Sequence, residues 1–163
     1  MGAGKSSVAR LLGTRLGVEV ADLDAMLEAE EGSSVVELFR RHGEAGFRER
    51  ESRALERSLA GGARVVACGG GIVLDRSNRE LLRTRFRTVW LEVSPEVAAA
   101  RMRSEIETRP MLEGGPIRQR LTELLRERSA LYAEVAAARI LTDGMPAAAV
   151  AAAVLDVLGD PSK

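Results

Sequence analysis

Apolar residues recur at helical spacing through the first third of the chain. A helix is predicted after residue 5, ending at Gly17, because one face of it is apolar at Val8, Leu11, Leu12 and Leu16. The apolar run 18–21 then predicts a strand. Ser34-x-x-Glu37 forms a capping box that opens a helix ending near Gly43. A second helical pattern follows, with apolar positions Phe47, Leu55 and Leu59.

The remaining two thirds alternate short apolar runs with helical patterns. Strands are predicted at 64–68 (RVVAC), 87–93 (RTVWLEV) and 138–142 (ARILT). A capping box, Ser77-x-x-Glu80, predicts the helix after the first of these, and Ser94-Pro95 predicts the start of the next. A long helix is predicted through Leu121, Leu124, Leu125 and Tyr132, and a terminal helix near Pro146.

Alternation of strands and helices is typical of a parallel sheet with helices on both faces, joined by right-handed crossovers. We therefore predict an α/β fold, a three-layer αβα sandwich with a central parallel sheet and four visible strands. The chain of 163 residues is long enough for one domain with its own core.

The composition excludes some classes of function but does not identify one. Lys and Arg number 24 and Asp and Glu number 24, so no net charge indicates a nucleic acid or an anionic membrane as partner. A single cysteine, Cys68, excludes an internal disulfide, and the apolar run 147–158 is too short to span a membrane. We expect a cytoplasmic protein, and a monomer because no apolar stripe is evident.

The chain opens on Met1-Gly-Ala-Gly-Lys-Ser-Ser7, which matches the second half of a phosphate-binding loop. Lys5 and Lys163 are the only lysines in a chain rich in arginine, so lysine stands where such a loop needs a compact charge. The first glycine of the motif and the central strand that leads into it would lie before Met1, so a chain that starts at Met1 would have a gap in its sheet. We expect Met1 to be an internal methionine of a longer protein.

Three further groups stand where strands end or helices turn. Asp22-x-Asp24 follows the first strand, and on an extended segment its two carboxylates share one side; the alternative is a solvated acidic turn. Gly69 to Gly71 let backbone approach a small ligand, or form only a tight turn. Arg48 lies one helical turn from Glu51, which either orients the guanidinium or forms a surface ion pair worth about 0.3–0.5 kcal/mol.

Taken in order, these pieces resemble the shikimate kinases, P-loop enzymes similar to nucleoside monophosphate kinases. The matching pieces are GAGKSS (2–7), DLD (22–24) with Glu28 after it, GEAGFRERE (43–51), CGGG (68–71), TRPML (108–112) and RSALYAEVA (128–136). The resemblance covers essentially the whole chain and implies one P-loop kinase domain over 1–163, with a lid at about 103–116. It implies phosphorylation of the 3-hydroxyl of shikimate by ATP with Mg²⁺.

The resemblance also implies roles for individual residues. The nucleotide would be held by Gly2, Ala3, Gly4, Lys5, Ser6 and Ser7, with Arg109 of the lid closing over the phosphates. Ser6 and Asp22 would hold the magnesium ion, the latter through water. Shikimate would be held by Asp24, Arg48, Gly70, Gly71 and Arg128, and the catalytic residues would be Lys5, Asp24 and Arg109.

Several points remain open at this level. The lid segment matches loosely, with Met111 where leucine is usual, and the adenine-side arginine is either Arg101 or Arg103. Pro146 fits an adenine-contacting turn or a helix start equally well. A kinase of another small acid, such as gluconate, and a non-catalytic nucleotide-binding domain are the alternative functions.

Overall fold

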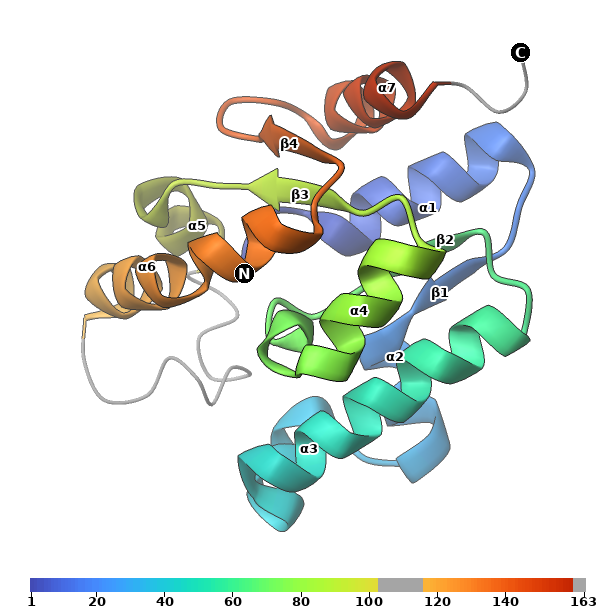
Figure 1. Ribbon diagram of the computed structural model, residues 1–163. Coiled ribbons are helices and arrows are strands. Elements are labelled where there is room, and N and C mark those ends of the chain that lie inside the picture. Colours follow the sequence, from blue (N-terminus) through green and yellow to red (C-terminus); the bar gives the residue numbers. More distant parts are fainter. Residues whose placement is uncertain (103–115, 160–163) are drawn as a thin grey trace.

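The computed structural model describes residues 1–102 and 116–159. Helices and strands alternate along the chain (Figure 1), in the order α1 (Lys5–Leu16), β1 (Val20–Asp22), α2 (Leu23–Glu31), α3 (Val35–Ala60), β2 (Val65–Ala67), the 3₁₀ turn η1 (Ile72–Leu74), α4 (Arg76–Arg85), β3 (Val89–Glu92), α5 (Pro95–Arg101), α6 (Ile117–Val135), β4 (Ala138–Leu141) and α7 (Ala147–Leu158). All four predicted strands are present.

The four strands form two parallel pairs rather than one sheet. β1 pairs with β2, with Ala21 opposite Val66, and β3 pairs with β4, with Leu91 opposite Ile140. Within the described residues no ladder joins the two pairs. The prediction of parallel strands is confirmed, but the continuous central sheet is not seen, because no strand of the described chain lies between β2 and β3.

Helices flank the strands in two groups (Figure 1). α1 and α7 pack on each other and on β4, through a cluster that includes Val8, Leu12, Ile140 and Val150. A second cluster joins α2, α3, α4 and α6, with Leu23, Leu38, Leu55 and Leu82 buried in it. The strands therefore lie between two helical layers, as the apolar pattern predicted.

Local signals placed most helix ends correctly. Ser34 and Glu37 form the predicted capping box, and Ser94 accepts a hydrogen bond from the N–H of Val97 at the start of α5. α3 continues through Gly43, where φ is 65° and the axis kinks, so the two predicted helices form one kinked helix.

The prediction of a capping box at Ser77 was wrong. Asp75 caps α4 by accepting from the N–H of Asn78, because Asp75 still has extended backbone angles whereas Ser77 lies inside the helix.

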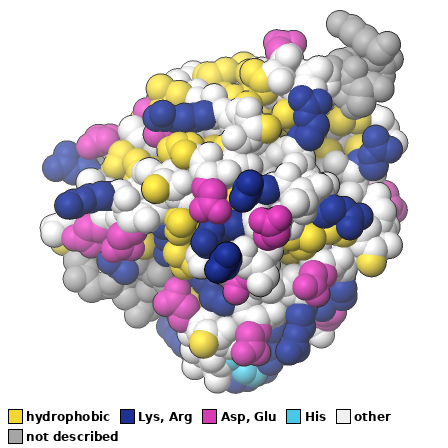
Figure 2. All heavy atoms as spheres, in the orientation of Figure 1, with side chains coloured by type: hydrophobic (Ala, Val, Ile, Leu, Met, Phe, Trp, Pro, Cys, Tyr) yellow, Lys and Arg dark blue, Asp and Glu magenta, His cyan; other side chains and the backbone are white. Residues whose placement is uncertain are grey.

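Charged side chains of both signs are interspersed on the face of the molecule in Figure 2, in keeping with the zero net charge. Among the described residues, no helix combines the length and apolar character needed to cross a membrane.

Candidate active site

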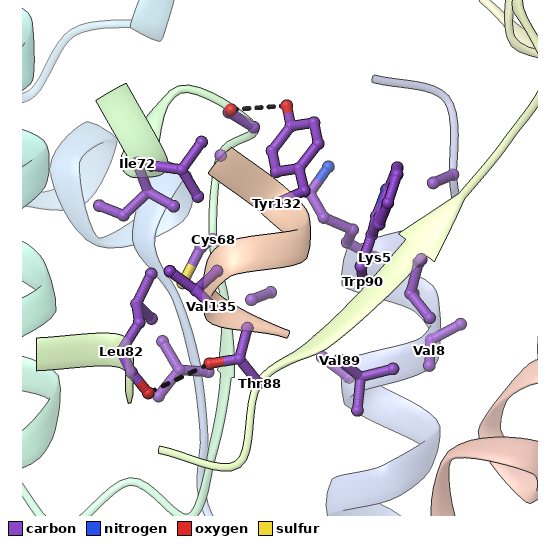
Figure 3. A pocket seen from close by; sticks show the side chains of 18 of the residues that line it. Lys5, Val8, Cys68, Ile72, Leu82, Thr88, Val89, Trp90, Tyr132 and Val135 are labelled. Atoms are coloured by element: carbon purple, nitrogen blue, oxygen red, sulfur yellow. Dashed lines mark hydrogen bonds between the residues drawn. The ribbon is translucent and has the colours of Figure 1, made fainter. Parts of the chain in front are cut away.

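One cavity of about 660 Å³ runs through the space between the two strand pairs. Apolar side chains of β2, β3, α1 and α7 line most of it. Its polar end lies at the carboxyl ends of the strands, where Lys5 extends among the side chains drawn in Figure 3. Ligands of parallel sheets bind at this edge, so the polar end is the candidate site.

The phosphate loop at this end has the backbone form that its glycines predict. Gly2 and Gly4 have φ values of 69° and 77°, in the region that favours glycine. Gly4 is the N-cap of α1 and brings no side chain to its first N–H groups, so these donors and the helix dipole are available to an anion. Lys5 is the first residue of the helix and lines the cavity.

Arg101 of α5 holds this loop through hydrogen bonds. Its guanidinium donates to the carbonyl of Gly2 at 3.1 Å and to the carbonyl of Thr142 at 2.9 Å. Thr142 in turn donates from its hydroxyl to the carbonyl of Glu92 at 2.9 Å. The loop is thereby tied to the ends of β3 and β4.

The acidic pair after β1 is arranged differently from the prediction. Asp22 ends the strand and caps α2, accepting from the N–H of Asp24 at 3.2 Å, while Asp24 already lies in the first helical turn. The two carboxylates therefore do not share one side of an extended segment, because the helix begins between them. Asp24 lines the cavity, and it lies near Gly69.

The Arg48–Glu51 pair is buried and faces the cavity. The guanidinium of Arg48 donates to the Glu51 carboxylate at 2.7 Å, and Glu51 is only 1% exposed. Burial raises the pKa of Glu51, and the charge and hydrogen bond of Arg48 oppose that rise. The alternative of a surface ion pair is wrong, and the orienting role of Glu51 fits the geometry.

A second arginine, Arg128 of α6, reaches the same cavity and is 6% exposed. Neither Arg48 Nε nor Arg128 Nε has a hydrogen-bond partner among the described residues. Two arginines with unused donors at one end of a cavity, one buried and one partly buried, are a strong recognition element for a small carboxylate or phosphate.

The triple glycine is required by close contacts rather than by backbone angles. A Cβ on Gly69 would stand 2.5 Å from Glu51 Oε1, and one on Gly70 would stand 2.8 Å from the Tyr132 hydroxyl. One on Gly71 would overlap the Arg48 guanidinium. Each glycine thus leaves room for a different polar side chain of the site.

Cys68 lies directly before these glycines, partly buried and near charged groups of the site. Burial raises the pKa of the Cys68 thiol to about 12, and the nearby Glu51 carboxylate adds to the rise while Lys5 opposes it. The thiol is therefore protonated at neutral pH and has no nucleophilic role here.

Most of the predicted site residues converge on this end of the cavity, including Lys5, Asp24, Arg48, Gly70, Gly71 and Arg128. Arg109, Arg103 and the lid up to residue 115 lie outside the described residues. Sequence reasoning did not single out Tyr132, whose hydroxyl lies against Gly70, although Tyr132 stands four residues after Arg128 and so on the same helix face. That spacing is the signal that was available.

Comparison with known proteins agrees with this geometry. The sequence profile described as shikimate kinase matches residues 1–159. The shikimate kinase of Symbiobacterium thermophilum is 40% identical over 159 residues, covering 97% of this chain and 91% of that protein. The shikimate kinase of Gloeobacter violaceus is 47% identical over 148 residues, and the match covers 91% of this chain and 82% of that protein.

Among solved structures, the shikimate kinase from Acinetobacter baumannii in complex with shikimate superposes with a TM-score of 0.92 at 35% identity. The match covers 100% of this chain and 91% of that one. With the profile, the relatives and the fold in agreement, the chain belongs to the shikimate kinase family.

Proposed function

We propose that this chain transfers the γ-phosphoryl group of ATP to the 3-hydroxyl of shikimate, giving shikimate 3-phosphate and ADP for aromatic amino-acid synthesis. The observation that carries the proposal is the pair of arginines, the buried Arg128 and the partly buried Arg48, at the end of the cavity that Lys5 also lines. Shikimate is a small polyol with one carboxylate, and two fixed arginines match that carboxylate.

In this proposal the loop 2–7 binds the phosphates of ATP. The N–H groups at the start of α1 receive the phosphate oxygens, and Lys5 neutralises charge on the β- and γ-phosphates. Gly2, Ala3, Gly4, Ser6 and Ser7 complete the loop. The tie from Arg101 to Gly2 keeps this loop in place before ATP arrives.

A magnesium ion fits the donors present. Ser6 lies in the first turn of α1 and Asp22 at the end of β1, so a hydroxyl and a carboxylate stand at neighbouring element ends. Mg²⁺ takes oxygen ligands and is commonly bound by one or two protein groups together with phosphates and water. When bound, the ion would neutralise charge on the phosphates.

The part of the site that would bind the acceptor substrate has more positively charged than negatively charged side chains. Lys5, Arg48 and Arg128 carry positive charge at the polar end, against the carboxylates of Asp24 and Glu51. Glu51 accepts a hydrogen bond from Arg48, and Asp24, which lines the same cavity, would accept the proton of the attacking hydroxyl. The positive excess suits an anionic acceptor, and exclusion of water by the lid with Arg109 completes the proposal.

We also propose that the enzyme works as a cytoplasmic monomer without nucleic-acid or membrane partners. The balanced charge and the interspersed signs on the face in Figure 2 support this.

The direct test is ADP release with Mg²⁺ and ATP, comparing shikimate, gluconate and no acceptor. Release that depends on shikimate and is lost in Lys5→Ala is expected, with a drop of at least about 100-fold, because the lysine neutralises charge that develops in transfer. Preference for gluconate would support a different acid kinase. ATP binding without turnover of either acid would support a non-catalytic domain.

Replacement of Gly71 by alanine is expected to weaken shikimate binding while leaving ATP binding intact. The added Cβ overlaps the Arg48 guanidinium, which is the movable end of a long side chain, so the fold adjusts but Arg48 loses its position. We expect the KM for shikimate to rise about 10-fold or more. Equal effects on the KM values of both substrates would contradict the assignment of this loop to the acceptor.

A further inference from the structure

The three carbonyl groups of the glycine loop 69–71 are all used as hydrogen-bond acceptors. Those of Gly69 and Gly71 accept from N–H groups three residues further along, at 3.2 and 3.0 Å. The carbonyl of Gly70 accepts instead from the hydroxyl of Tyr132, at 2.7 Å, across 62 residues of sequence (Figure 3). One contact from a distant helix therefore fixes the middle of the loop.

We propose that Tyr132 is a positioning residue that fixes the orientation of the Gly70–Gly71 peptide and so aims the Gly71 N–H as a donor to the acceptor substrate. The inference rests on the proposed function. It adds to the site a residue that the sequence pattern placed only within a predicted helix.

Planarity links the two ends of that peptide. In a trans peptide the N–H points opposite to the C=O, so holding the Gly70 carbonyl toward the Tyr132 hydroxyl turns the Gly71 N–H away from it. Within the described part of the chain, no acceptor is recorded for the N–H of Gly70 or Gly71. These donors remain for a ligand.

A run of glycines needs such a restraint. Without Cβ atoms, the peptides of the loop rotate with little steric cost, and a rotated Gly70–Gly71 peptide would exchange its N–H for a carbonyl oxygen. That oxygen would repel an anionic substrate held by Arg48 and Arg128. The Tyr132 hydroxyl favours the orientation in which the oxygen is already bonded.

The phenol itself is held in place. Its ring packs against Trp90 of β3, with centroids 5.4 Å apart and planes tilted by 39°. Burial raises the pKa of Tyr132, which the charge of Arg128 opposes, and the group stays protonated and able to donate at neutral pH. Since Arg128 precedes Tyr132 by one helical turn, α6 delivers one group to the substrate and one to the loop.

The test is Tyr132→Phe, which keeps the ring and removes the hydroxyl. We expect the shikimate KM and the calorimetric Kd for shikimate to rise about 5- to 10-fold, as for loss of one hydrogen bond, with the KM for ATP unchanged within about 2-fold. The control is Ser129→Ala on the same helix, whose hydroxyl bonds only the helix backbone at Leu125 and whose loss should move neither KM.

The amide spectrum of ¹⁵N-glycine-labelled protein tests the loop without any substrate. The Gly71 amide signal is expected to shift and broaden in Tyr132→Phe relative to the parent chain, because its peptide samples both orientations. An unchanged Gly71 signal, or a parallel rise of both KM values with a large loss of thermal stability, would overturn the inference. If the parent chain neither binds nor phosphorylates shikimate, the proposed function fails, whereas the amide result still decides the role of Tyr132 in the loop.

Discussion

Removal of the Arg48 guanidinium is expected both to abolish shikimate phosphorylation and to destabilise the fold. Arg48 is one of the two cations assigned to the substrate carboxylate, and charge-assisted bidentate hydrogen bonds are about twice as strong as neutral ones. We expect Arg48→Ala to lower kcat/KM for shikimate by about 100-fold or more, a loss of roughly 3 kcal/mol in transition-state binding.

The loss of stability has a separate cause. Glu51 is 1% exposed and its carboxylate accepts from Arg48, so the variant leaves a buried charge without its partner. Breaking such a pair from one side costs about 3–5 kcal/mol, most of which is desolvation of the remaining charge. Urea or thermal unfolding of the variant measures it.

The direction in which the stability of Arg48→Ala changes with pH follows from the pKa of Glu51. The pKa of Glu51 is already raised above its ordinary value of 4.5, and removal of Arg48 takes away a charge and a hydrogen bond that lower this pKa. A carboxyl whose folded-state pKa is raised binds its proton more tightly in the folded protein. Stability of Arg48→Ala should therefore fall, relative to the parent chain, as the pH rises above about 4.5, and Glu51→Gln in the same variant should remove that slope.

Two controls separate the causes. Arg53→Ala removes a surface arginine of the same helix, which stands 4.0 Å from Glu49 with both side chains more than half exposed, and should change neither activity nor stability appreciably. Arg48→Met with Glu51→Leu removes both charges and should restore stability without activity. Full activity in Arg48→Ala would refute the assignment to the substrate.

Filling the space between β2 and β3 with an added strand is expected to raise thermal stability and ATP affinity, the second of the two largest effects. Both strands have an edge without a partner among the described strands, and the cavity between them is walled by apolar side chains from both flanking helical layers. An added extended strand is expected to fit this space and to pair with both edges. The lining residues include Val8, Leu12, Val66, Val89, Leu91 and Val154.

The direction of such a strand follows from the position of Met1. Met1 packs beside Val93 and Ala98, just past the carboxyl end of β3, and lines the same cavity. The loop that follows it lies near the carboxyl end of β2, since Lys5 and Cys68 line the same cavity (Figure 3). A strand entering Met1 therefore runs in the direction of β2 and β3 and can pair with both as a parallel strand.

The experiment joins about five valine, isoleucine and leucine residues and a glycine-containing link to Met1, a length matched to the neighbouring strands. Each buried side chain contributes about 1.5–3 kcal/mol, against about 1–2 kcal/mol per residue for ordering the backbone. With the new ladder bonds, a net gain of a few kcal/mol corresponds to a rise of roughly 10 °C in Tm. Affinity for ATP should rise too, because the strand anchors Gly2.

A glycine–serine extension of the same length is the control. It adds the same residues ahead of Met1 without apolar side chains and should leave Tm unchanged. Equal Tm values for the two extended proteins would show that the space between β2 and β3 does not accept a strand.

The local parts of this structure could be read from the sequence because neighbouring residues decide them. Ser34 and Glu37 satisfy the first N–H groups of α3 whatever packs on that helix, and Ser94-Pro95 does the same for α5. The loop 2–7 likewise follows from glycines whose backbone angles other residues rarely adopt. The failures at Ser77 and Asp24 are also local, since each lay one or two residues from the true helix boundary.

What the sequence could not decide depends on contacts between distant segments. For Arg48 and Glu51 seen alone it favoured a surface ion pair over an orienting pair, and only the packing of α3 against the glycine loop buried Glu51. The sequence pattern placed Tyr132 within a predicted helix, but its hydrogen bond to the Gly70 carbonyl joins residues that are 62 positions apart.

The sequence by itself determined the order of strands and helices, the phosphate loop and the family resemblance, because these rest on periodicity, caps and motifs within short windows. The tertiary structure decided which charges are buried together, why three glycines are needed, and that the strands form two pairs around one cavity. Burial and pairing are properties of segments that meet only after folding, so no short window of sequence contains them.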